Sequence, residues 1–320
     1  MLTAAKYEKK LGAATREAFG RTLLELGREN PDIVVGDADL TKSTMTTYFA
    51  KEFPDRLFEC GIAEANMVAI GAGLALAGKI PFVSSFSAFV LTKGFEQLRV
   101  LVAYPNVNLK VVGTHSGISI GEDGPSQMSV EEIALACALP NFVVLSPADE
   151  VATRWAVRWA AAHQGPVFIR TGRPKAPIVY NSDAHFEMGK AVELVPGSDV
   201  TLLATGLMVA EALLAAAQLE SEGISARVLD IHTIKPLDEE ALERAARETG
   251  ALVVAEEHLV DSGLGVRVAQ ALAKRCPAPV EFVGLHGYAE SGSPDELLDK
   301  YGLRAANIAA AARRVLARKA

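Results

Sequence analysis

One glutamate lies in a segment too apolar to hydrate it. Glu64 belongs to CGIAEANM, residues 60–67, where a short strand expected at 57–59 leads into a helix of small and apolar residues. A carboxylate there needs a hydrogen-bond partner or a proton, because desolvation favours its neutral form. Glu64 either satisfies the free N–H groups at a helix N-terminus or serves as a tuned acid–base group at the carboxyl end of a parallel strand, where α/β proteins bind ligands.

Two further segments follow expected strands and carry side chains suited to ligands. Phe86 and Phe89 come directly after a strand, three residues apart, so they can share one aromatic surface that either packs in the core or supports a flat ligand. The segment GDADLTKST places Asp39 and Ser43 after another strand. Both segments are expected at the same edge of the sheet as Glu64.

A glycine-rich loop and an arginine segment complete this polar edge. THSGISIGEDGPSQ, residues 114–127, brings His115 and Asp123 into a loop whose glycines allow tight turns and close approach of a ligand. RTGRPK, residues 170–175, places Arg173 near another strand end, and an arginine fork suits phosphate or carboxylate. Since the carboxyl ends of parallel strands share one edge, we expect these side chains to cluster as an active site.

Short β-branched runs alternate with longer alanine-rich stretches in the first half of the chain. The runs are continuously apolar, which is typical of buried parallel strands, and strand–helix alternation implies right-handed crossovers. The expected strands are residues 33–35, 80–84, 109–112, 142–145 and 167–169, and the expected helices are residues 64–77, 94–103, 130–138 and 148–162. We predict a mainly parallel sheet covered by helices on both faces.

The alternation lapses between residues 173 and 198, where prolines and polar turns predict a linker. A second, smaller alternating set follows, with strands expected at 200–203, 226–231, 252–255 and 280–283 and helices at 209–220, 238–249 and 266–274. The predicted fold class is therefore α/β with two doubly wound domains. Their expected limits are 1–178 for the first domain, 179–196 for the linker and 197–320 for the second domain.

Composition excludes several classes of protein. The 320 residues are 50% hydrophobic and 22% charged, which excludes a disordered chain, and the net charge of −7 argues against a nucleic-acid partner. Three widely spaced cysteines predict neither disulfides nor zinc, and no metal site made by this chain alone is expected. The N-terminus lacks the apolar core of a signal peptide, and no apolar stretch could span a bilayer, so we expect a cytoplasmic protein with no membrane partner.

Four motifs together resemble one enzyme family. GDADLTKST, GIAEANM, the THSG…GEDG loop and HTIKPLD at residues 232–238 are each short, but in combination they are specific. The chain is similar to the C-terminal half of the transketolase family made as a separate subunit, over residues 16–288. The resemblance implies a pyrimidine-binding domain followed by the transketolase C-terminal domain, with thiamine diphosphate at a subunit interface.

The resemblance implies roles for residues at the cofactor. In that family the glutamate matching Glu64 is catalytic: it contacts N1′ of the aminopyrimidine ring, and sharing its proton favours the imino tautomer that activates the coenzyme. A further family aromatic position is Thr92 here, which implies a thinner stacking wall. The implied cofactor-binding residues are Asp39, Leu40, Glu64, Phe86 and Phe89.

The resemblance also implies a site for a sugar phosphate. Two arginines, a hydroxyl and an imidazole can hold a phosphate by charge-assisted hydrogen bonds. The family loop usually reads GEDGPTHQ, whereas this chain has GEDGPSQM, so a glutamine that cannot become a cation replaces a histidine and the preferred donor ketose is expected to differ. The implied substrate-binding residues are Arg16, Ser43, His115, Asp123, Gln127 and Arg173.

Half of the family's cofactor site has no counterpart in this sequence. The GDG…N segment that holds the diphosphate and Mg²⁺ in transketolases is missing. The resemblance therefore implies an N-terminal transketolase subunit that binds diphosphate and Mg²⁺, an α2β2 assembly, and a chain that is inactive alone. Small residues in the expected helix, namely Ala65, Gly71 and Gly73, would allow close helix–helix contact with a partner or within the domain.

Three alternatives stay open. The β subunit of a 2-oxoacid dehydrogenase has the same two-domain plan and a matching glutamate, although the GEDG loop argues against it. A fragment of 1-deoxyxylulose-5-phosphate synthase is a second alternative, but that family is normally one long chain. The third is a catalytically degenerate, regulatory subunit, which Gln127 favours and Glu64 opposes.

The second domain carries no catalytic motif, so we interpret it as an assembly element, with His258 structural.

Overall fold

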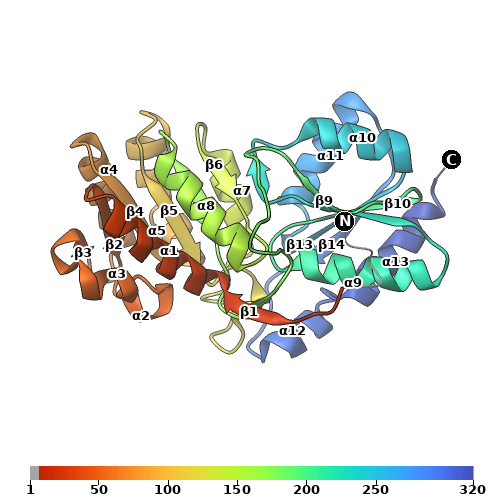
Figure 1. Ribbon diagram of the computed structural model, residues 1–320, viewed down its shortest axis with the longest axis horizontal. Helices are drawn as coiled ribbons and strands as arrows, with labels where there is room; N and C mark the ends of the chain where they lie inside the picture. Colours follow the sequence, from red (N-terminus) through yellow and green to blue (C-terminus); the bar gives the residue numbers. More distant parts are fainter. Residues whose placement is uncertain (1–6, 320) are drawn as a thin grey trace.

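The computed structural model describes residues 7–319, which form two α/β domains side by side (Figure 1). Each domain has a largely parallel sheet with helices packed against it, so the predicted fold class is confirmed. Residues 1–6 and 320, the outer ends of the two predicted domains, lie outside the described residues.

The first domain is built on a seven-stranded sheet of order β12-β6-β7-β5-β4-β2-β3. Every pairing in it is parallel except that of β12, which runs antiparallel to β6. Strands β2 and β5 are buried along their whole length, which explains why their sequences read as continuous apolar runs. Six of the strands are β2 (Ile33–Asp37), β3 (Leu57–Glu59), β4 (Ile80–Phe86), β5 (Lys110–Thr114), β6 (Val143–Leu145) and β7 (Val167–Arg170).

Helices flank this sheet and include several that the sequence analysis missed, notably α1 and α5. The start of α8 is set locally, because the Asp149 side chain accepts a hydrogen bond from the N–H of Ala152. The elements are α1 (Thr15–Glu29), α2 (Thr41–Thr44), α3 (Thr47–Glu52), α4 (Glu64–Leu76), α5 (Ser87–Lys93), α6 (Phe95–Gln97), α7 (Glu132–Ala138) and α8 (Glu150–Ala162), with the short 3-10 turns η2 (Pro54–Arg56) and η4 (Ile118–Ile120) and the π-helical segment η3 (Leu98–Ala103).

The second domain has a five-stranded sheet of order β14-β13-β10-β11-β9, in which β9 alone is antiparallel to its neighbour. Its strands are β9 (Val192–Val195), β10 (Val200–Ala204), β11 (Ala226–Asp230), β13 (Leu252–Leu259) and β14 (Val280–Leu285). Its helices are α9 (Met208–Ser221), α10 (Glu239–Thr249), α11 (Leu264–Arg275), α12 (Pro294–Lys300) and α13 (Ala305–Leu316). The sequence analysis did not predict α12 or α13.

The segment expected to be a linker, residues 179–196, is packed against the rest of the protein. It contains strand β9, which pairs with β11. Val179, Tyr180 and Phe186 are buried in it, and the Tyr180 hydroxyl donates a 2.6 Å hydrogen bond to Asp230. A few apolar side chains among the polar ones are enough to anchor this connecting segment.

One strand from the second half of the chain joins the sheet of the first domain. Strand β12 (Thr233–Lys235) lies between elements of the second domain along the chain but joins the edge of the first sheet beside β6. Near the N-terminus, β1 (Leu11–Ala14) pairs antiparallel with β8 (Lys175–Pro177) to form a separate two-stranded sheet. The backbone hydrogen bonds between β12 and β6 therefore fix the second domain against the first.

Candidate active site

The predicted site residues lie at one edge of the seven-stranded sheet. Strands β7, β5, β4, β2 and β3 are neighbours and parallel, so the segments that follow them leave from the same edge. The residues at this edge are Asp39, Leu40 and Ser43 after β2, Glu64 after β3, Phe86 and Phe89 at the end of β4, His115, Asp123 and Gln127 after β5, and Arg173 after β7.

Glu64 is the first residue of α4 and has only 2% of its surface exposed. Its Oε1 atom has no hydrogen-bond partner among residues 7–319, and its Oε2 atom lies 3.7 Å from Nζ of Lys93. Lys93 itself is half exposed. A buried polar atom without a partner is costly, and Oε1 of Glu64 is free to accept a hydrogen bond from a ligand.

Phe86 and Phe89 form an aromatic stack next to Lys93, the lysine that lies near Glu64. The rings of Phe86 and Phe89 have centroids 5.4 Å apart and planes 17° from parallel, and the imidazole of His115 stacks on Phe86 at 3.8 Å. The ammonium of Lys93 lies 4.3 Å from the centroid of the Phe89 ring. Thr92 adds nothing to this stack, because its hydroxyl is exposed and donates to a carbonyl of its own helix.

A buried aspartate that the sequence analysis did not single out shapes the loop after β2. The carboxylate of Asp37 accepts hydrogen bonds from the N–H of Leu40 at 2.7 Å and from the hydroxyls of Thr44 and Thr46 at 2.7 and 2.8 Å. Burial raises the pKa of Asp37 to about 6. These bonds hold Asp39, exposed and with a φ of 63°, at the sheet edge.

Arg16 and His115 join the first helix to the loop after β5. Nη1 of Arg16 donates to the carbonyl of Ser43 at 2.6 Å and to Nε2 of His115 at 3.3 Å. Since Nε2 accepts, the ring proton is on Nδ1, which donates to the hydroxyl of Thr114 at 2.8 Å. Burial, together with the charges of Arg16 and Arg173, lowers the pKa of His115 to about 3, so this imidazole is neutral.

Arg173 clamps the other end of the same loop. Its Nη1 donates to the carbonyl of Ile120 and, at 2.7 Å, to the carboxylate of Glu122. Asp123 is exposed, whereas Gln127 is half-buried and accepts a hydrogen bond from the neighbouring hydroxyl within the loop. Arg16, His115 and Arg173 are therefore close enough for the charges of the two arginines to affect the pKa of His115. Asp123 and Gln127 occupy the more open part of the loop.

The two domains match two family models in sequence. Residues 12–178 match the pyrimidine-binding domain of transketolase, and residues 189–308 match the transketolase C-terminal domain. The chain belongs to the transketolase family. Because both matched domains are those of the C-terminal half, it corresponds to the C-terminal section of a split transketolase.

Similar proteins include both split and single-chain transketolases. A solved split-gene transketolase, described as an inactive β4 tetramer, is 48% identical, with a TM-score of 0.91 over 97% of this chain and 100% of that one. The 6-deoxy-6-sulfo-D-fructose transketolase subunit SqwH of Clostridium sp. strain MSTE9 is 43% identical over 95% of both chains. Human transketolase is 41% identical over 94% of this chain, which spans only 48% of the human protein.

The residues at this edge of the seven-stranded sheet fit the aminopyrimidine ring of thiamine diphosphate. A pyrimidine-binding domain implies that cofactor. The unpartnered Oε1 atom of Glu64 is the kind of group that a ring nitrogen with a shared proton would satisfy, and the stacked rings of Phe86 and Phe89 offer a face for a flat heterocycle.

Two kinds of feature were not found in the described part of this transketolase chain, residues 7–319. No group of three or more His, Cys, Asp or Glu side chains is placed to hold a metal ion. No helix combines the length and apolar character needed to cross a membrane.

Lys93 and Asp37 are site residues that the sequence analysis missed. Lys93 lies four residues after Phe89, which on a helix places both on one face, so its spacing was a usable signal. Asp37 ends an apolar strand and is followed by two threonines that bind it, a weaker signal because the distances in sequence are seven and nine residues. Neither could be recognised from residue type alone.

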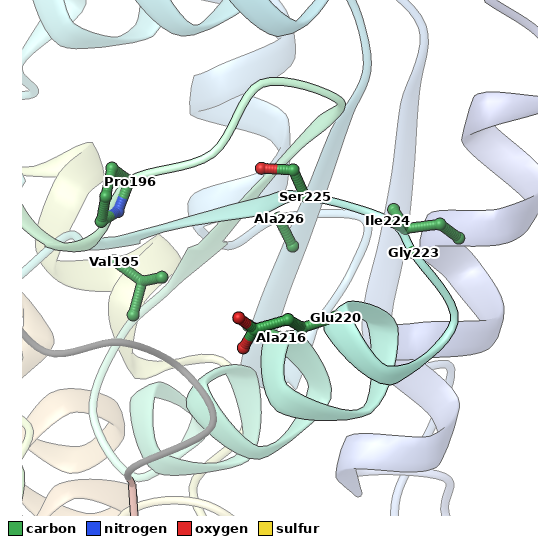
Figure 2. A pocket seen from close by; sticks show the side chains of 8 residues that line it. All are labelled: Val195, Pro196, Ala216, Glu220, Gly223, Ile224, Ser225 and Ala226. Carbon is green, nitrogen blue, oxygen red and sulfur yellow. The ribbon is translucent and has the colours of Figure 1, made fainter.

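A pocket in the second domain is separate from this site (Figure 2). It lies between the segment that ends β9 and the C-terminal part of α9, and it contains none of the predicted site residues. Its lining is apolar apart from the carboxylate of Glu220 and the hydroxyl of Ser225.

Proposed function

We propose that this chain supplies the pyrimidine-binding half of a two-chain transketolase that transfers a two-carbon ketol unit between sugar phosphates. The observation that supports this most strongly is the buried carboxyl of Glu64, whose Oε1 atom has no hydrogen-bond partner among residues 7–319. Glu132 and Glu257 are also buried with one oxygen unpartnered among these residues, but the other oxygen of each accepts a hydrogen bond within the chain. The charged group nearest to the carboxyl of Glu64 is instead Lys93 at 3.7 Å, which leaves its acceptors to an added molecule.

In this proposal Glu64 holds a proton at the pyrimidine ring, and the stacked side chains of Phe86 and Phe89 support the ring face. Asp39 and Leu40 border the ring from the loop that Asp37 anchors. When bound, thiamine diphosphate supplies an electron sink for breaking and forming the carbon–carbon bond beside a ketose carbonyl. The chain's own contribution is to orient the cofactor, exclude water and share a proton with it.

The phosphate end of the sugar is proposed to bind at Arg16, Ser43, His115 and Arg173. Burial and then the charge of Arg173 lower the pKa of Arg16, and His115, which lies near both arginines, is neutral. These two guanidinium groups suit a phosphate dianion, which would share Arg173 with the carboxylate of Glu122. Asp123 and Gln127 in the open part of the loop are proposed to contact the sugar, with Gln127 influencing which ketose is the donor.

The diphosphate and Mg²⁺ are proposed to be bound by an N-terminal subunit with a GDG…N segment, in an α2β2 assembly. The exposed face of α4, the helix that begins with Glu64, supports a protein partner: Ile70 and Leu76 are 38% and 77% exposed. Gly73 is exposed with open space beside it, whereas Gly71 packs against the first sheet and so serves the domain's own core.

Two observations bear on the remaining alternatives. The relatives reported above are transketolases, and the paired arginines at the loop suit a sugar phosphate better than a simple 2-oxoacid. A regulatory subunit without chemistry would not need a buried carboxyl with a free acceptor. We also propose a cytoplasmic location, in keeping with three free cysteines.

The experiment combines this chain with its N-terminal partner and compares the mixture with each chain alone. Thiamine diphosphate and Mg²⁺ are titrated calorimetrically, and turnover is measured with D-fructose 6-phosphate, 6-deoxy-6-sulfo-D-fructose and D-fructose as donors and an aldose phosphate as acceptor. We expect negligible cofactor binding by this chain alone, and binding with ketol transfer by the mixture. Tight binding by this chain alone would contradict the split site, and an inactive mixture that binds cofactor would favour the regulatory alternative.

A further inference from the structure

A carboxylate from the second domain contacts the loop that carries the predicted substrate residues. Glu257 lies on β13 and is 2% exposed. Its Oε1 atom accepts a 2.6 Å hydrogen bond from the N–H of Ser119, in the short turn η4. Gly117, just before this turn, has a φ of 81° and lies so close to Glu257 that a Cβ added there would be 2.2 Å from the carboxyl carbon.

The turn that Glu257 holds connects two of the residues proposed to bind phosphate. His115 lies two residues before Gly117, and the carbonyl of Ile120, at the end of η4, accepts from Arg173. The loop is also held at Gly117, between His115 and η4, because the N–H of Gly117 donates to the carbonyl of Ser129 at 2.7 Å. A shift of η4 would therefore move both the His115 end and the Arg173 end of the loop.

Glu257 is itself held by a buried ionic group between the domains. Nη2 of Arg170 donates to the carbonyl of Glu257 at 2.8 Å, and its Nε donates to the carboxylate of Glu132 at 2.5 Å. All three side chains are buried. Burial raises the pKa of Glu257, and the charge of Arg170 opposes that effect. Burying so many charged groups is expensive, and an apolar contact would join two domains at lower cost.

The adjacent glutamate shows what a purely structural carboxylate does here. Glu256 is also buried on β13, and it accepts hydrogen bonds from the N–H groups of Leu264 and Gly265 at 2.7 and 2.8 Å. Those groups start α11 of the same domain, so Glu256 stabilises its own domain's fold. Glu257 reaches in the opposite sense, across the domain boundary to the substrate loop.

The second domain contacts the loop at a second place. A Cβ on Gly121 would lie 3.0 Å from the ring of Pro294, and a Cβ on Gly124 would lie 2.4 Å from the hydroxyl of Ser291. Both glycines have positive φ values, 87° and 78°. The GEDG part of the loop is therefore packed against the segment before α12, which leaves Glu257 as the polar anchor of a larger contact.

We propose that Glu257 is a positioning residue: from the second domain, it fixes η4 and thereby the placement of His115 and Arg173 for the phosphate of the sugar. This inference rests on the proposed function. It assigns the second domain a part in substrate selection, in addition to assembly.

The test uses the two-chain complex with Glu257→Ala, Glu257→Gln and Glu256→Ala. The first removes the acceptor, the second keeps an acceptor oxygen at the same reach, and the third removes the neighbouring buried carboxylate as a control for lost stability. The readout is the ratio of kcat/KM for D-fructose 6-phosphate to that for D-fructose. We expect Glu257→Ala to lower this ratio roughly tenfold through KM, Glu257→Gln to restore most of it, and Glu256→Ala to leave it unchanged while lowering Tm.

Hydrogen exchange of the 117–120 backbone in this chain alone gives a second readout that does not depend on turnover. Faster exchange in Glu257→Ala but not in Glu256→Ala, together with the lower ratio, supports the proposal. Unchanged exchange, or faster exchange with an unchanged ratio, overturns it. A wild-type complex that turns over neither donor contradicts the proposed function instead, so the two failures are distinguishable.

Discussion

The two ends of the candidate site differ in how complete they are within this chain. At the Glu64 end, a buried oxygen has no partner among residues 7–319, and the helix that carries it exposes large apolar side chains. At the Glu257 end, the loop is held by hydrogen bonds from both domains, with Arg173 and the N–H of Ser119 already paired. The first region awaits other molecules, whereas the second is organised before any ligand arrives.

This difference separates two physical tasks. In the proposed function, the cofactor ring binds to the unpartnered oxygen of Glu64, and the partner subunit covers the exposed face of α4. Both contacts form only in the assembled enzyme. In the same proposed function, the sugar phosphate instead binds to preorganised side chains, so that little ordering entropy is lost when the substrate enters. Four predictions follow from the contrast, from the largest expected effect to the smallest.

Glu64→Gln tests the incomplete end most directly. The amide cannot share a carboxyl proton with the cofactor, so turnover by the two-chain complex should fall by about 10³-fold or more, while assembly stays intact. Glu96→Gln, an exposed glutamate paired with Arg99 on a nearby helix, is the matched control and should be neutral. Initial rates and analytical ultracentrifugation measure the two properties. Near-normal turnover in Glu64→Gln would remove Glu64 from the mechanism.

Leu76→Asp tests whether the exposed face of α4 is covered by the partner. Burying a leucine is worth about 1.5–3 kcal/mol, and a buried charge costs more, so affinity for the N-terminal subunit should fall roughly hundredfold. The fold of this chain should be unaffected, because Leu76 is 77% exposed. Val266→Asp places the same charge on an exposed site of the second domain, 43% accessible, and serves as control. Equal partner affinity in both variants would place the interface elsewhere.

Gly117→Ala tests whether the loop at the Glu257 end of the site is held rigidly. Two glycines have almost the same φ, 81° at Gly117 and 80° at Gly223, but only Gly117 has a neighbour, the carboxyl of Glu257, where a Cβ would go. Gly223→Ala should cost about 1 kcal/mol of unfolding free energy from backbone strain alone. Gly117→Ala should cost about 3 kcal/mol, because the contact with Glu257 is also displaced. Equal losses in chemical denaturation would show that the loop yields easily and is not preorganised.

The neutral imidazole predicts a pH effect. The pKa of His115 is about 3 in the folded chain and ordinarily 6.5, so the unfolded chain binds a proton at higher pH than the folded one. Its contribution to stability is therefore complete above pH 6.5 and is lost as the pH falls towards 3. The difference in Tm between wild type and His115→Gln should shrink on acidification from pH 7.5 to pH 4.5. The exposed His286→Gln is the control, and a constant difference for His115→Gln would contradict a neutral, buried ring.

Several elements were predictable because their cause is local. The buried parallel strands read as continuous apolar runs, and α4, α8, α10 and α11 have strong helix formers at helical spacing. Other elements were missed because their stability comes from contacts distant in sequence. Helix α1 packs on α8, and α13 packs on α9 and β14. Strand β9, inside the expected linker, was missed for the same reason, since it needs β11 to form.

The candidate site divides in the same way. Glu64, Phe86, Phe89, His115 and Arg173 were found from residue type and from their place after expected strands. Asp37, Lys93 and Glu257 were not, because each matters through what it touches and not through what precedes it along the chain. Arg170 shows the limit most plainly: it ends β7, and only the structure shows that it is buried in an ion pair with Glu132.

The alternation of buried strands and helices, the residue types expected at one sheet edge and membership of the transketolase family were determined by the sequence alone, because apolar periodicity and short motifs are properties of neighbouring residues. Only the tertiary structure decided that β12 crosses into the first sheet, that one oxygen of Glu64 is left without a partner, and that Glu257 reaches Ser119 138 residues away. Burial and hydrogen bonding depend on which distant segments meet, and no pattern along the chain encodes that directly.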